Sequence, residues 1–111
     1  MNISYTHKWV LQRVTAVLLI PLSFWFIYQC ISFQDFKYED MQYFFQSYFN
    51  SFLFGIMMVA MLFHAKLGCE TIIQDYISTI YLQKIFKAFI NILTIISLFL
   101  VIMAIIKMSF I

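Results

Sequence analysis

Residues 88–106, AFINILTIISLFLVIMAII, contain no charged side chain and decide the fold class of this protein. An α-helix rises 1.5 Å per residue, so about 20 apolar residues cover the roughly 30 Å of hydrocarbon in a bilayer. An uninterrupted apolar run of this length does not alternate as a β-strand does, and an open sheet in lipid would leave backbone groups unpaired. Residues 88–106 therefore predict a transmembrane α-helix.

Two further runs have the same character. Residues 14–31 are uncharged over their whole length, although they contain Pro21, a residue that kinks helices. Residues 52–73 are apolar except for three ionisable side chains near the C-terminal end of the run. The sequence therefore predicts an all-α integral membrane protein with three transmembrane helices, which form part of a larger helix bundle.

The composition of the whole chain agrees with this prediction. Of its 111 residues, 64% are hydrophobic and 11% are charged, whereas about a quarter of the residues in a soluble domain are charged. There is material for one membrane domain, residues 1–111, and the net charge of +2 is too small for a nucleic-acid-binding surface. The first apolar run has no small-residue cleavage site, so we expect a retained span and no cleavable signal peptide.

The charges between the runs predict the orientation of the chain. Two basic residues precede the first run and two lie in the connection 74–87; they are Lys8, Arg13, Lys84 and Lys87. The connection 32–48 instead carries one lysine against three acidic residues. By the positive-inside rule, we expect the N-terminus and the connection 74–87 on the cytoplasmic or matrix side.

The connection 32–48 is rich in aromatic residues. Its large apolar side chains fall near helical spacing, with acidic residues between them: Phe33, Phe36, Met41, Phe44, Phe45 and Tyr48. We expect an amphipathic segment that lies at the outer membrane interface and serves as an aromatic anchor without chemistry.

The segment that carries chemistry is HAKLGCETIIQDY, residues 64–76. An ionisable residue at membrane depth is costly and by default marks a functional site, which singles out His64. Gly68 follows one turn later on the same face, where a missing side chain lets a helix or a flat cofactor approach. A neutral imidazole in an apolar site is a good axial ligand of haem iron. The alternative is a histidine that is hydrogen-bonded to another helix.

A six-coordinate haem needs two axial ligands. The other histidine, His7, precedes the first run, whereas His64 lies well inside the second. Because of this difference in depth, we expect the second ligand to come from another subunit. His7 and Arg13 flank the inner end of the first run, and arginine suits bidentate pairing with carboxylates, including haem propionates. Ordinary positive-inside anchoring is the alternative for Arg13.

Asp75 and Tyr76 lie at the inner boundary, three turns beyond His64. A tyrosine hydroxyl at this position can donate a hydrogen bond to a quinone carbonyl, and the adjacent carboxylate can take part in proton delivery. The alternative is an interfacial tyrosine beside a solvated aspartate.

Together these motifs resemble the hydrophobic membrane anchor of succinate dehydrogenase (complex II). That family shows a histidine and an R-x-T-A-like step at the first span, and H-x-x-x-G with a D-Y pair ending twelve residues after the histidine. The matching positions here are His7, Arg13, Thr15, Ala16, His64, Gly68, Asp75 and Tyr76. Lys66 departs from the pattern, but two residues from His64 it should point elsewhere.

The resemblance implies an anchor that is not catalytic alone and that works in the respiratory chain and the tricarboxylic acid cycle. Its implied partners are a flavoprotein subunit that oxidises succinate, an iron–sulfur subunit, and a second, cytochrome b556-like anchor that shares a haem b. Carried over, His64 is an axial ligand of the haem iron, and Arg13 and His7 lie near the propionates. Tyr76 donates a hydrogen bond to ubiquinone, beside Asp75. The implied location is a bacterial or mitochondrial inner membrane.

Two rival functions stay open on the sequence. The first is the anchor of a fumarate reductase that uses menaquinone. The second is a structural or assembly subunit of a different membrane complex, in which His64 only packs.

Overall fold

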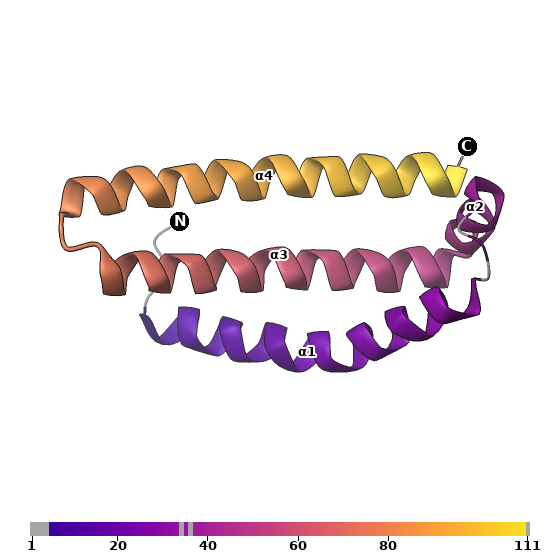
Figure 1. Ribbon diagram of the computed structural model, residues 1–111, viewed down its shortest axis with the longest axis horizontal. Helices are drawn as coiled ribbons and strands as arrows, with labels where there is room; N and C mark the ends of the chain where they lie inside the picture. The colour runs from indigo at the N-terminus through magenta and orange to yellow at the C-terminus, as the bar shows by residue number, and fades with distance from the viewer. Residues whose placement is uncertain (1–4, 34, 36, 111) are drawn as a thin grey trace.

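The structure, a computed structural model, describes residues 5–33, 35 and 37–110, and these form four helices (Figure 1). The helices are α1 (Tyr5–Ser32), α2 (Tyr38–Gln46), α3 (Tyr48–Tyr76) and α4 (Ile80–Phe110). α3 lies in the middle and packs against α1 on one side and α4 on the other, while α2 lies across one end (Figure 1). The described part of the chain is therefore an all-α bundle built around α3.

The prediction of three membrane-crossing helices is confirmed, because α1, α3 and α4 are each long and apolar enough to span a bilayer. Each helix extends beyond the apolar run that predicted it, so that α3 and α4 are joined by residues 77–79 alone. The runs end where polar or charged side chains begin, but lysine, arginine and glutamine favour a helix as well as leucine does. Their long side chains can also reach the interface from within a helix.

Pro21 lies inside α1 without ending it. α1 is bowed in Figure 1, whereas α3 and α4 are straight. Proline accounts for such a bend because it removes one backbone hydrogen bond of the helix and its ring presses on the preceding turn.

The aromatic connection contains the expected amphipathic helix, α2, which Phe44 anchors to the bundle. The Phe44 side chain is buried, and its ring centroid lies 5.8 Å from those of Trp25 and Phe33 and 5.1 Å from that of Phe45. These spacings and tilted or edge-on geometries are those that aromatic pairs prefer. Phe36, which the periodicity also included, lies outside the described residues.

A polar contact joins α2, α3 and α4 at the same end of the bundle. The Ser51 hydroxyl lies 2.6 Å from the Phe45 carbonyl oxygen, to which it donates, and 2.8 Å from the Ser109 hydroxyl. Ser51 is buried. Small hydroxyl side chains of this kind let apolar helices approach closely and hydrogen-bond across the interface.

The chain on its own buries few side chains. In α3, 22% of the span is buried, against 6% of α1 and of α4, so α3 is the central helix and the outer two present most of their apolar side chains outward. In a bilayer such side chains face lipid or the helices of a partner.

Candidate functional site

His64 is held against α1 by a hydrogen bond between two helices. Its Nδ1 atom lies 3.1 Å from the Oγ1 atom of Thr15, which comes from the second turn beyond His7 on α1. Thr15 is buried and His64 is partly buried. No hydrogen-bond partner of the other ring nitrogen, Nε2, is found within residues 5–33, 35 and 37–110. The hydrogen bond to another helix, which was the alternative to a haem ligand, is therefore present, and it occupies only one of the two ring nitrogens.

Gly68 lies one turn beyond His64, beside Gln12 of α1. A Cβ atom built at Gly68 would meet only the side-chain Nε2 of Gln12, at 3.8 Å, which is an ordinary contact distance. Close packing against α1 thus does not require a glycine here. Gly68 is partly exposed, and the neighbouring Ala65 is exposed and small. Small residues therefore lie near His64 on α3, and the nearest neighbour of Gly68 from another helix is the flexible end of Gln12.

These residues fit a haem iron better than a bare metal ion. In the described part of the chain, no three His, Cys, Asp or Glu side chains gather closely enough to hold a metal. A haem brings four nitrogen ligands of its own, so the protein has to supply only axial ligands. An imidazole whose Nδ1 is held by Thr15, and whose Nε2 has no hydrogen-bond partner among the described residues, meets that requirement.

The structure does not bring His7 to His64. His7 is exposed in the first turns of α1, eight residues before Thr15. At 1.5 Å per residue, this spacing separates the two histidines by about 12 Å along the helix axis. His7 is therefore too far along the bundle to bind the same iron as His64.

Arg13 lies on a different face of α1 from Thr15, because two residues correspond to about 200° around a helix. Its side chain is exposed, and its guanidinium carbon lies 5.3 Å from the ring centroid of Trp9. This is the geometry of a cation–π contact. The guanidinium of Arg13 therefore packs on Trp9 of its own helix, and the side chain is exposed on the outside of the bundle.

Asp75 and Tyr76 form the last turn of α3, and both are exposed; 84% of Tyr76 is accessible. Asp75 follows His64 by eleven residues, which places it about 17 Å along the axis and about 20° around it. This end of α3 lies beside the N-terminal ends of α1 and α4 (Figure 1). The phenol and the carboxylate thus lie at the end of the bundle to which Lys8, Arg13, Lys84 and Lys87 belong.

A buried ion cluster lies on another face of α3. Glu70 binds Lys66 through Oε1 at 3.3 Å and Lys8 of α1 through Oε2 at 3.1 Å. The side chains of Lys66 and Glu70 are 5% and 7% exposed. The pairing of Lys66 with Glu70 follows from their spacing of four residues. The part played by Lys8 was missed, because no local signal links it to Glu70.

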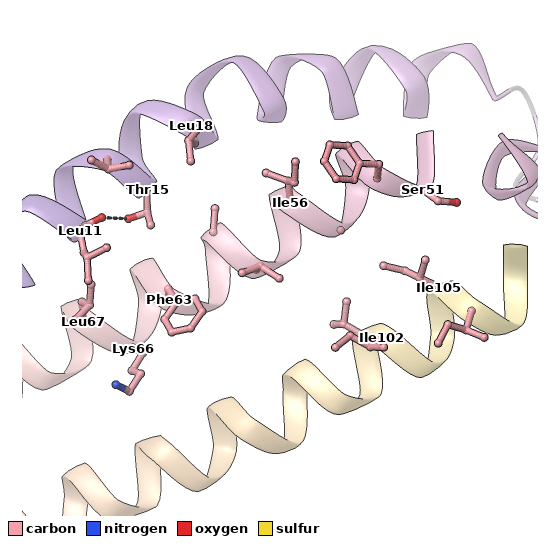
Figure 2. A pocket seen from close by; sticks show the side chains of 17 residues that line it. Leu11, Thr15, Leu18, Ser51, Ile56, Phe63, Lys66, Leu67, Ile102 and Ile105 are labelled. Carbon is pink, nitrogen blue, oxygen red and sulfur yellow. Dashed lines mark hydrogen bonds between the residues drawn. The ribbon is translucent and has the colours of Figure 1, made fainter. Parts of the chain in front are cut away.

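A cavity of about 760 Å³ lies beside this cluster, between α1, α3 and α4 (Figure 2). Its walls are almost entirely apolar, with Lys66 toward one end and Ser51 toward the other (Figure 2). Lys66 lines the cavity and His64 does not, so the two residues point to different faces of α3, as their spacing predicts. Thr15 lines the cavity and is also hydrogen-bonded to His64.

Comparison with known proteins identifies relatives of this chain. Residues 4–104 match the family model described as the succinate dehydrogenase/fumarate reductase transmembrane subunit. The chain is also similar to three proteins named succinate dehydrogenase hydrophobic membrane anchor subunit. It is 32% identical to that of Rickettsia bellii (strain RML369-C) over 75 residues, 33% to that of Rickettsia prowazekii (strain Madrid E) over 75, and 34% to that of Rickettsia conorii (strain ATCC VR-613 / Malish 7) over 76.

The aligned part makes up 68% of this chain and 60% of each of these relatives. The chain therefore spans about 60% of the length of the curated relatives that it matches.

Proposed function

The chain belongs to the family of succinate dehydrogenase and fumarate reductase transmembrane subunits, and we propose that it anchors a succinate:ubiquinone oxidoreductase, complex II, in the membrane. The observation that carries the proposal is the state of His64. Its imidazole belongs to α3, a helix that is long and apolar enough to cross a membrane; Thr15 occupies Nδ1, and Nε2 has no partner among the described residues. An ionisable residue inside a membrane-crossing helix is costly and by default marks a functional site. Lys66 and Glu70 of the same helix pair with each other, whereas His64 has no charged partner among the described residues.

His64 would supply one axial ligand of a haem b. The second ligand would come from a second, cytochrome b-type anchor subunit, because His7 lies about 12 Å away along the bundle axis. Haem b, when bound, supplies one-electron transfer at a potential that its axial ligands and their surroundings set. Arg13, on the outer face of α1, would pair with a propionate across the subunit interface, and His7 would lie nearer the membrane surface.

Tyr76 and Asp75 would serve ubiquinone at the end of α3. The phenolic hydroxyl of Tyr76 donates a hydrogen bond to a quinone carbonyl oxygen, and the Asp75 carboxylate passes protons from the aqueous side. Oxidation of succinate to fumarate releases two electrons and two protons, and reduction of ubiquinone to ubiquinol takes up the same numbers. The exposure of both side chains in the last turn of α3 supports this assignment.

The flavoprotein and iron–sulfur subunits would dock at the end of the bundle that carries Tyr76. Four basic residues, Lys8, Arg13, Lys84 and Lys87, belong to the helix ends that meet there (Figure 1). By the positive-inside rule this end faces the bacterial cytoplasm or the mitochondrial matrix. The membrane is then a bacterial or mitochondrial inner membrane, and succinate is oxidised on its inner side.

A reduced-minus-oxidised optical spectrum of the purified complex tests the proposal. We expect a b-type haem band in the wild-type complex and its loss in a His64→Ala variant. Ile95→Ala, at a position of α4 that is 65% exposed, is the control and should keep the band. A band that survives His64→Ala would contradict the ligand assignment, and purification without a flavoprotein partner would favour a structural subunit of another complex.

A second candidate follows from the breadth of the matching family, which includes fumarate reductases. In that case the same residues would serve menaquinone, and electrons would run from quinol to fumarate. Extraction of the quinone that copurifies with the complex separates the two candidates: ubiquinone supports succinate oxidation, and menaquinone supports fumarate reduction.

A further inference from the structure

We propose that Thr15 is a positioning residue for the haem ligand: its hydroxyl oxygen accepts the Nδ1 proton of His64 and so keeps the lone pair of Nε2 available to the iron. The inference rests on the proposed haem site and adds a residue on α1 that selects the tautomer and the ring orientation of its ligand.

The assignment follows from counting protons at the Thr15 hydroxyl. Its Oγ1 atom lies 2.9 Å from the carbonyl oxygen of Leu11 and 3.0 Å from that of Gln12, and a carbonyl can only accept. The single hydroxyl proton is thus shared between these two carbonyls. Toward His64, at 3.1 Å, the oxygen can only accept, so Nδ1 carries the proton. A neutral imidazole that is protonated on Nδ1 bears its lone pair on Nε2.

The other buried threonine shows that this arrangement is not simply what threonine does in a helix. Thr94 of α4 donates to the carbonyl of Ile90, four residues earlier, at 2.8 Å. No second partner of Thr94 is found among the residues that the structure describes. Thr15 makes the same backward bond, but it also reaches across to α3. Thr94 is therefore a matched control, since it has the same side chain, similar burial and no histidine.

The contact between Thr15 and His64 is suited to fix the orientation of the imidazole. Thr15 is 8% exposed, and its two bonds to carbonyls fix its rotamer, so its oxygen presents one fixed acceptor to the imidazole. Partners of this kind orient a ligating histidine and raise its basicity toward the metal, and their loss typically lowers affinity by about 10- to 100-fold. Without the oxygen, the imidazole could rotate or change tautomer, and its partly buried Nδ1–H would lack a partner.

The test uses three variants of the intact complex. Thr15→Val removes the oxygen and keeps the shape, Thr15→Ser restores an oxygen, and Thr94→Val removes the equivalent hydroxyl from α4. The measurements are the haem content per complex and the midpoint potential of the b-type haem, obtained by optical redox titration. We expect Thr15→Val to lower haem retention about 10-fold. Haem that it keeps should have a raised potential, because a histidine with an unpaired Nδ1–H donates less electron density to the oxidised iron.

Thr15→Ser and Thr94→Val should both match the wild type in haem content and in potential. Equal values in Thr15→Val and Thr94→Val would overturn the inference while leaving the haem assignment standing. A wild-type complex without a b-type band, or a band that survives His64→Ala, would overturn the proposed haem site and this inference with it.

A measurement on the wild-type complex does not depend on whether the valine variant assembles. Electron–nuclear double resonance of the oxidised haem should detect a hydrogen-bonded Nδ1 proton on the ligand. In deuterated buffer this proton should exchange slowly, because Thr15 is buried and His64 partly so. A proton that exchanges as fast as one facing water would contradict the assignment.

Discussion

Replacing Glu70 by glutamine removes one charge from the buried ion cluster and leaves two. In the wild type, Oε1 of Glu70 lies 3.3 Å from Nζ of Lys66 and Oε2 lies 3.1 Å from Nζ of Lys8. Glutamine keeps the shape of the side chain, but its neutral amide cannot balance two ammonium groups. The Lys8 side chain is 25% exposed and can turn toward water, whereas that of Lys66 is 5% exposed and cannot do so without moving helices.

The size of the effect follows from these distances. With an effective dielectric constant of about 20, each attraction amounts to roughly 5 kcal/mol before the cost of desolvation is subtracted. Removing one partner of a buried pair typically destabilises a protein by about 3–5 kcal/mol, because the other charge is left buried and uncompensated. We expect Glu70→Gln to fall in this range, with Lys66 responsible for most of it.

Thermal dissociation of the purified complex in detergent measures the effect, with this chain followed on native gels after heating. Glu39→Gln, an exposed change of the same type on α2, is the control and should alter stability by less than about 0.5 kcal/mol. Adding Lys66→Met to Glu70→Gln should recover most of the loss, because it removes the stranded charge and extends the apolar wall of the cavity. The reasoning fails if Glu70→Gln dissociates at the temperature of Glu39→Gln, or if the double variant is no more stable than the single one.

Three further outcomes are expected. Tyr76→Phe should slow quinone reduction and leave succinate oxidation by a soluble artificial acceptor nearly intact; equal loss of both activities, measured side by side, would count against a quinone contact. The Gly68→Leu variant should still assemble, because the nearest atom of α1 is the flexible end of Gln12, 3.8 Å from a Cβ atom built at Gly68. It should nevertheless lower the haem content of the complex. Full haem content would show that no flat group lies against Gly68. Phe44→Ala should lower the dissociation temperature of the complex by an amount equivalent to about 3–5 kcal/mol. Tyr43→Ala, at a side chain that is 79% exposed, should leave this temperature unchanged. Similar shifts in the two variants would contradict the anchoring of α2 by Phe44.

The sequence alone was enough to predict the three long helices and the amphipathic segment. These features are local, because a bilayer requires each spanning segment to satisfy its own backbone hydrogen bonds. Hydropathy therefore predicts which residues span the membrane. The same local signals did not predict where the helices end, since polar residues that are good helix formers continue a helix beyond its apolar run.

Only the tertiary structure decided which residues meet across the helices. Thr15 and His64 are 49 positions apart, Ser51 and Ser109 are 58 apart, and Lys8 reaches Glu70 from a different helix. Length and hydropathy set where a helix crosses the membrane, but its rotation about its own axis and its choice of neighbour depend on side-chain packing and on polar contacts between helices. For this reason the sequence could single out His64 as a candidate ligand, while the residue that holds its imidazole became visible only when α1 was placed against α3.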